Sequence, residues 1–172
     1  MAQTKRSVNA RQTNSLPTQK KGKAAASNRA ALEPVTNQTT KQATRILVAE
    51  DNPTNQKVLT CLLQPTGCHL DFVENGLDAI AAVARSEYDL VLMDMRMPKM
   101  DGVTATYRIR SLPEPAASVP IIALTADVVT GAKEKFEAAG MNGFVEKPIN
   151  KELLFKTIEE HTGEPISHPD FA

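Results

Sequence analysis

Short, continuous runs of apolar residues, each followed by a polar side chain, constrain the fold of this chain more than any other feature. The runs are Ile46–Ala49, Leu90–Met93, Val119–Leu124 and Gly143–Val145. Continuous apolar runs of this length are typical of strands buried on both faces, as in a parallel sheet. The segment His69–Val73 alternates more between apolar and polar residues, which indicates an edge strand.

Segments with the apolar spacing of helices separate these runs. Five helices are expected. The first begins at Pro53 with Asn52 or Asp51 as cap, the second follows Asn75, and the third spans Val103–Leu112. The fourth spans Val129–Ala139 with Gly140 just beyond it, and the fifth follows Asn150. We expect the inward residues to be Val58, Leu59, Leu62 and Leu63 in the first, Leu77, Ile80, Ala81 and Ala84 in the second, and Leu153, Leu154, Ile158 and His161 in the fifth. Strand and helix alternate five times, which predicts an α/β fold with an open, doubly wound sheet.

Charge divides the chain into a basic arm and an acidic body. Residues 1–44 hold eight basic residues and one acid, a net charge of +7, so the rest of this formally neutral chain carries −7. The arm has few apolar residues and no aromatic one, so we expect a disordered segment or linker. The expected organisation is therefore an arm (1–44), one domain (45–162) and a short C-terminal tail (163–172).

Several classes of protein are disfavoured by what the chain lacks. No apolar stretch approaches the length of a membrane span, and the N-terminus has no apolar core of a secretory signal. Cys61 and Cys68 form no disulfide or metal-binding pattern, and we expect both to be inert buried thiols. We therefore expect a cytoplasmic protein.

Polar residues follow the expected strands at one edge of the sheet. Glu50 and Asp51 follow the first run, Asp94 the third strand, Thr125 the fourth and Lys147 the fifth. In a doubly wound sheet, the ligand site lies beyond the carboxyl ends of the strands, so these five side chains should converge.

The convergence of these side chains predicts a phosphoryl-transfer site. Three carboxylates held together repel one another, and an oxygen-ligated divalent cation such as Mg²⁺ relieves the repulsion. Lys147 and Thr125 then remain to meet an anion beside Asp94. A carboxylate surrounded by metal, ammonium and hydroxyl suits a nucleophile that accepts a phosphoryl group.

Four ordered segments of the chain resemble the receiver domain of two-component response regulators. They are ILVAEDN (46–52), DLVLMDMRMPKMDG (89–102), IIALTAD (121–127) and GFVEKPI (143–149). The resemblance covers about residues 44–162, and EDNPTNQKVL (50–59) looks most like receivers attached to hybrid histidine kinases. It implies a flavodoxin-like sheet of five parallel strands in the order 2-1-3-4-5, with five helices.

The resemblance also implies a role for each residue of the site. Asp94 would be the phosphoacceptor, Lys147 would contact the phosphoryl group, and Mg²⁺ would be held by Glu50, Asp51, Asp94 and the backbone carbonyl of Arg96. Thr125 and Phe144 would be the switch pair, although Phe144 can also be read as ordinary core. Lys147–Pro148 matches the family's cis peptide bond.

The leading functional hypothesis is a phosphorylation-dependent signalling switch rather than an enzyme, although it would assist its own phosphorylation and dephosphorylation. It would accept a phosphoryl group from a histidine kinase or histidine phosphotransfer protein. A changed face of the fourth helix, fifth strand and fifth helix would then control an unidentified partner protein, and no DNA-binding domain is expected. One alternative is a pseudo-receiver that binds a partner without phosphorylation. Another is a Mg²⁺-dependent phosphatase with an Asp nucleophile, but Arg96 occupies the position of its general acid and cannot act as one. The chain could be a stand-alone receiver or a piece of a hybrid kinase with residues 1–44 as linker.

Overall fold

The computed structural model of the chain describes residues 43–126 and 132–166. These residues all lie within one compact unit of the chain. The expectations for nearly all of the basic arm, for the end of the tail and for the first residues of the fourth helix lie outside the described residues.

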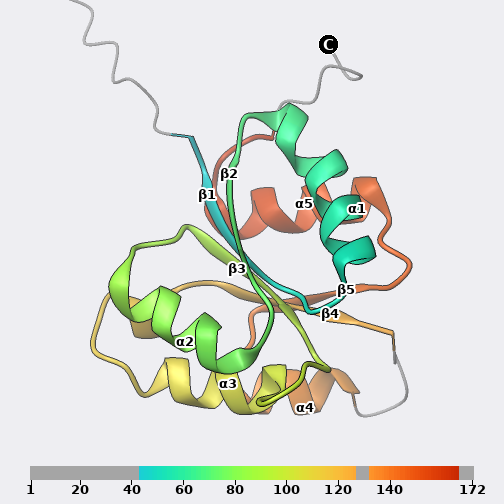
Figure 1. Cartoon of the computed structure of the whole chain (residues 1–172). Coiled ribbons are helices and arrows are strands. Elements are labelled where there is room, and N and C mark those ends of the chain that lie inside the picture. The colour runs from blue at the N-terminus through green and yellow to red at the C-terminus, as the bar shows by residue number, and fades with distance from the viewer. Residues whose placement is uncertain (1–42, 127–131, 167–172) are drawn as a thin grey trace, which may run out of the picture. The chain divides into compact units, whose positions relative to one another are not determined.

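Five parallel strands form one sheet in the order β2-β1-β3-β4-β5 (Figure 1). The strands are β1 (Arg45–Ala49), β2 (His69–Val73), β3 (Leu90–Asp94), β4 (Ile121–Thr125) and β5 (Gly143–Glu146). All residues of β3 and β4 are buried, as continuous apolar runs predict, whereas β2 lies at an edge and is only partly buried. The predicted fold class and strand order are therefore confirmed.

Five α-helices cover the two faces of this sheet (Figure 1). They are α1 (Pro53–Leu63), α2 (Gly76–Arg85), α3 (Gly102–Arg110), α4 (Ala132–Ala138) and α5 (Lys151–Thr162); two short 3₁₀ helices, η1 (Gln64–Thr66) and η2 (Ala116–Ser118), complete the described elements. Helices α1 and α5 pack on one face, and α2, α3 and α4 pack on the other. Alternate residues of each central strand contribute to the two resulting cores, since successive side chains of a strand point to opposite faces.

Side chains that accept backbone N–H groups fix where the helices begin. Asn52 accepts from the backbone N of Thr54 at 2.8 Å, so Asn52 rather than Asp51 caps α1, and Pro53 is its first residue. Asn75 and Asn150 cap α2 and α5 in the same way. Since Asn52 takes the capping role, Asp51 is available for another function.

The inward faces of three helices differ from the sequence prediction. Val58, Leu77 and Leu153 are 42%, 44% and 44% exposed, and Ala84 is exposed as well, although each was expected to face the core. Helix α2 instead lies on the sheet through Ala79 and Val83, small enough for close approach, which turns Leu77 outward. The expectation for Cys61 was also wrong, because this side chain is exposed on α1.

A hydrogen-bonded cluster ties β1 to β2 at the edge of the sheet where the strands begin. Asp71 Oδ2 accepts from the Arg45 guanidinium at 2.7 Å and from the Tyr88 hydroxyl at 2.9 Å. His69 Nε2 lies 3.4 Å from the other carboxylate oxygen, Asp71 Oδ1. Burial raises the pKa of Asp71, but the hydrogen bonds from Arg45 and Tyr88, together with the neighbouring positive charge of Arg45, hold that pKa below its usual value. This cluster is therefore a source of pH-dependent stability.

Arg110, at the end of α3, joins three segments that are distant in sequence. Its guanidinium donates to the backbone carbonyls of Gly140, Ala117 and Val119 at 2.7–2.8 Å, and to Asn142 Oδ1 at 2.9 Å. Gly140 has a φ of +89°, as expected for the glycine that follows α4. Arg110 thus holds the connections before β4 and before β5 against α3.

Candidate functional site

The carboxyl ends of four neighbouring strands bring the expected polar residues to one edge of the sheet. Glu50 directly follows β1, Asp94 ends β3, Thr125 ends β4 and Lys147 directly follows β5. Asp94 is paired in register with Leu124, next to Thr125, and Thr125 is paired with Glu146, next to Lys147. Sheet register therefore places these residues side by side, although they are up to 97 positions apart in sequence.

Three carboxylates meet at this edge. Oxygen atoms of Glu50, Asp51 and Asp94 all lie within 4.8 Å of one another. Glu50 is fully buried, Asp94 is 7% exposed, and Asp51 is exposed to solvent. Three oxygen donors with one open side are the ligand chemistry that Mg²⁺ prefers, so the donor set fits this ion.

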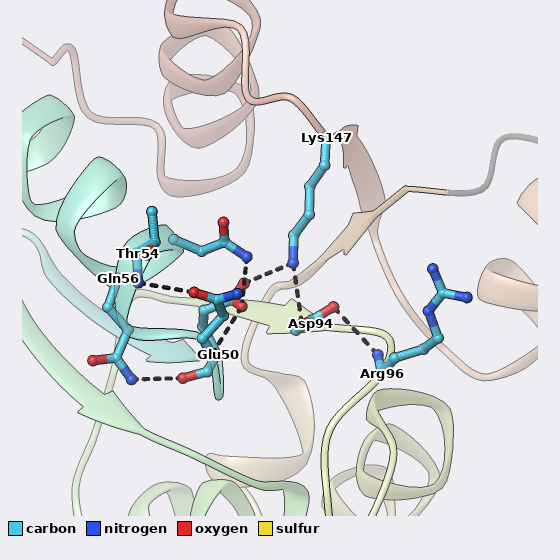
Figure 2. Close-up of polar contacts among 8 residues, drawn as sticks. Glu50, Thr54, Gln56, Asp94, Arg96 and Lys147 are labelled. Carbon is cyan, nitrogen blue, oxygen red and sulfur yellow. Dashed lines mark hydrogen bonds and ion pairs between the residues drawn. The ribbon is translucent and has the colours of Figure 1, made fainter.

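The Lys147 ammonium lies between the carboxylates of Glu50 and Asp94, which are the two buried ones of the site (Figure 2). Its Nζ is 2.7 Å from Glu50 Oε2 and 3.0 Å from Asp94 Oδ2. The Lys147 backbone N donates to the carbonyl of Thr125 at 2.7 Å, which fixes the start of the side chain, and the Lys147–Pro148 peptide bond is cis as expected. One ammonium group is thus shared by two carboxylates. With the third carboxylate, Asp51, the site holds three acidic side chains and one basic one.

Helix α1 supplies contacts to Glu50 that sequence reasoning did not find. Asn55 Nδ2 and the backbone N of Asn52 donate to Glu50 Oε1 at 2.8 and 3.3 Å. Gln56 Nε2 donates to the Glu50 backbone carbonyl at 2.7 Å (Figure 2). The available signal was the position of Asn55 and Gln56 in the first turns of a helix that begins just after Glu50.

The segment after β3 holds the second oxygen of the Asp94 carboxylate. The Arg96 backbone N donates to Asp94 Oδ1 at 3.2 Å (Figure 2). Asp94 therefore has one oxygen toward Lys147 and the other toward the turn that follows its strand. The carbonyl of Arg96, expected as a metal ligand, belongs to the same turn.

Thr125 and Phe144 lie on neighbouring strands, β4 and β5. Thr125 is 3% exposed, whereas Phe144 is half-buried and its ring centroid lies 6.3 Å from that of Phe136 on α4. A surface pocket of about 300 Å³ adjoins Phe144; it is lined by residues of α4, β5 and α5 and of the connection before β5, including Phe136, Met141 and His161. The aromatic ring of Phe144 is therefore next to open space on this face.

The comparison with protein families agrees with this geometry. A family model described as the response regulator receiver domain matches residues 46–159. The chain belongs to this family. A receiver domain is a signalling domain of two-component systems and not an enzyme in the usual sense.

The similar proteins include histidine kinases, some of them named as hybrid signal transduction histidine kinases. The histidine-protein kinase BarA of Escherichia coli K12 is 38% identical over 123 residues, which cover 72% of this chain and 13% of BarA. The sensor protein GacS of Pseudomonas syringae pv. syringae is 37% identical over 130 residues, 74% of this chain and 14% of GacS. This receiver chain thus spans only about an eighth of the length of such relatives.

Two solved structures show the same receiver fold. The receiver domain of the sensor kinase PA1611 from Pseudomonas aeruginosa PAO1, with magnesium coordinated in its active site cleft, matches with a TM-score of 0.66 and 38% identity, covering 71% of this chain and 99% of that one. A chain of the Saccharomyces cerevisiae complex between the histidine phosphotransfer protein Ypd1 and the Ssk1 receiver domain matches with a TM-score of 0.65 and 29% identity, covering 70% and 90%. Within residues 43–126 and 132–166, no helix is long and apolar enough to cross a membrane.

Proposed function

We propose that this receiver domain accepts a phosphoryl group on Asp94 from a phosphohistidine of a histidine kinase or histidine phosphotransfer protein. The observation that carries the proposal is the placement of the Lys147 ammonium 3.0 Å from Asp94 Oδ2. Asp94 also has two further carboxylates within 4.8 Å, so it lies between a cation and a set of metal-type ligands. The similarity to hybrid kinase receivers supports this class of donor.

The metal of the proposed reaction is Mg²⁺, held by Glu50, Asp51, Asp94 and the backbone carbonyl of Arg96. When bound, Mg²⁺ supplies positive charge that neutralises the three carboxylates and the phosphoryl oxygens. The chain's own residues do the rest: Lys147 and the turn at Arg96 orient the two oxygens of Asp94. The buried position of Asp94 also limits the access of water.

The transfer step exchanges one bond to phosphorus for another. An oxygen of the Asp94 carboxylate attacks phosphorus, the P–N bond to the donor imidazole breaks, and its electron pair stays on the imidazole nitrogen. The product is an acyl phosphate on Asp94, and its new charge is met by Lys147 and by the hydroxyl of Thr125. The same groups would assist the later hydrolysis of the acyl phosphate.

The proposed readout runs from Thr125 to Phe144. A phosphoryl group on Asp94 draws the Thr125 hydroxyl toward it, which vacates space beneath α4. Phe144 on the adjacent strand fills that space, and its contact with Phe136 changes. The face formed by α4, β5 and α5, where the pocket beside Phe144 lies, then binds a downstream protein differently.

Phosphorylation with a small donor tests the proposal. The protein, incubated with Mg²⁺ and acetyl phosphate, is expected to form a hydroxylamine-labile phosphoprotein that a phosphate-affinity gel resolves. Asp94→Asn should abolish it, whereas Asp101→Asn should not, because Asn can replace Asp101 as the cap of α3. Undiminished labelling of Asp94→Asn would overturn the assignment, and an unlabelled native chain would favour the pseudo-receiver alternative.

A further inference from the structure

The two oxygens of the fully buried Glu50 carboxylate face different parts of the molecule. Oε2 accepts from Lys147 at 2.7 Å and faces the site. Oε1 faces α1 and accepts from Asn55 Nδ2 at 2.8 Å and from the backbone N of Asn52 at 3.3 Å. A carboxylate without solvent contact depends on such donors, so they fix the plane in which it lies.

Asn55 makes the shorter of the two contacts to Oε1. A distance of 3.3 Å is beyond the usual range for an N–H···O bond, whereas 2.8 Å is well within it. Gln56, the next residue of α1, donates to the backbone carbonyl of Glu50 and so holds the main chain rather than the carboxylate. The orientation of the carboxylate on its α1 side therefore depends mainly on the Asn55 amide.

Lys147 cannot give Glu50 the same fixed hold. Its ammonium is already shared with Asp94, and in the proposed reaction it also meets the phosphoryl group. Asn55 donates from α1 to Oε1 of Glu50, whereas Lys147 contacts Oε2. Its hydrogen bond can therefore persist while the contacts of Lys147 change.

The geometry points to Asn55 as a positioning residue of the magnesium site, which holds one oxygen of Glu50 so that the other faces the metal. This inference rests on the proposed function. Loss of a hydrogen bond behind a metal-site carboxylate commonly weakens metal binding by about tenfold or more. Asn55 would thus set the magnesium affinity without touching the phosphoryl group.

Titration of the native chain and its variants with MgCl₂ at constant ionic strength, followed by backbone amide NMR shifts, tests the inference. We expect the dissociation constant to rise about tenfold for Asn55→Ala and also for Asn55→Leu, which fills the space of the amide. Thr60→Ala is the matched control. It removes a side-chain hydrogen bond within the same helix, from the Thr60 hydroxyl to the Gln56 backbone carbonyl, and leaves the contacts of Glu50 unchanged. Equal affinities of the native chain and both Asn55 variants would overturn the inference.

Two further measurements separate positioning from a general effect on the fold. First, raising the MgCl₂ concentration should restore acetyl phosphate labelling of Asn55→Ala, because its defect is in magnesium affinity. Second, when Glu50 is already replaced by Gln, adding Asn55→Ala should change the magnesium affinity less than about twofold. A labelling defect that saturating MgCl₂ leaves in place, or an undiminished effect in the Glu50→Gln background, would contradict a positioning role. A native chain that binds no magnesium and takes no phosphoryl group would contradict the proposed function itself.

Discussion

Replacing Asp51 with Asn should stabilise the protein in the absence of magnesium and destroy its response to the metal. Asp51 is exposed, it does not cap α1, and its carboxylate lies within 4.8 Å of those of Glu50 and Asp94. Lys147 contacts the other two carboxylates and not Asp51. The charge of Asp51 is therefore mainly repelled in the folded protein.

The size of the effect can be worked out from these distances. At 4.8 Å, the upper limit of these separations, two unit charges in a medium as polar as water repel by about 0.9 kcal/mol, so the two neighbours together cost at least about 1.7 kcal/mol. Attraction to the N-terminus of α1 and to the more distant Lys147 ammonium returns roughly half of this. About 1 kcal/mol of stabilisation remains for Asp51→Asn at low ionic strength, which corresponds to a rise in Tm of about 4 °C.

Magnesium should reverse this order. A ligand that binds only the folded state, at ten times its dissociation constant, stabilises that state by about 1.4 kcal/mol. The native chain should gain this amount, whereas Asp51→Asn should gain little because it has lost a metal ligand. The melting temperatures of the two proteins should therefore cross as MgCl₂ is added.

Thermal unfolding followed by circular dichroism, in EDTA and then in MgCl₂, measures both effects. Glu87→Gln is the control, because it removes one exposed negative charge from the connection before β3, at the opposite edge of the sheet. We expect this variant to keep the native magnesium response. The reasoning is refuted if Asp51→Asn melts below the native chain in EDTA, or if it gains as much as the native chain from magnesium.

Three further outcomes are expected. Arg110→Ala should lower the free energy of unfolding in urea by about 3 kcal/mol, because four hydrogen bonds are lost, and Arg110→Lys should recover only part of it. Folding lowers the pKa of Asp71, so this residue stabilises the protein above the pKa of an unfolded Asp, and the stabilisation is lost as the pH falls through the folded pKa. Asp71→Asn should therefore make the Tm less dependent on pH below about pH 4. Thr125→Ala should still bind beryllofluoride, a phosphoryl mimic, but should lose the NMR shift changes around Phe144; native-like changes there would contradict the proposed coupling.

The pattern of apolar runs was sufficient to predict a parallel, doubly wound sheet and the residues at its functional edge, whereas the strand order was implied by the resemblance to receiver domains. A strand buried on both faces is apolar along nearly all of its length, and the polar residue that ends the apolar run marks the carboxyl end of the strand. Glu50, Asp94, Thr125 and Lys147 could therefore be assigned to one edge from sequence position alone. The caps at Asn75 and Asn150 were predictable for a similar reason, because a cap depends on a few neighbouring residues.

The helix faces were not predictable to the same accuracy. Helical spacing gives a broad apolar stripe, and the part of that stripe that meets the sheet depends on how closely the helix can approach. In α2 the small Ala79 allows close approach, and Leu77 is turned to solvent. The choice between Asn52 and Asp51 as cap was likewise left open by the sequence.

The internal contacts of the site were decided by the tertiary structure alone. Lys147 reaches both Glu50 and Asp94, and Asn55 holds the far oxygen of Glu50, because three strands and a helix meet at one corner of the sheet. Sequence specifies which side chains arrive at that corner, since each follows its own strand or helix. Which atoms pair there depends on differences of about 1 Å in how these elements pack, and hydrogen bonds weaken steeply over such distances.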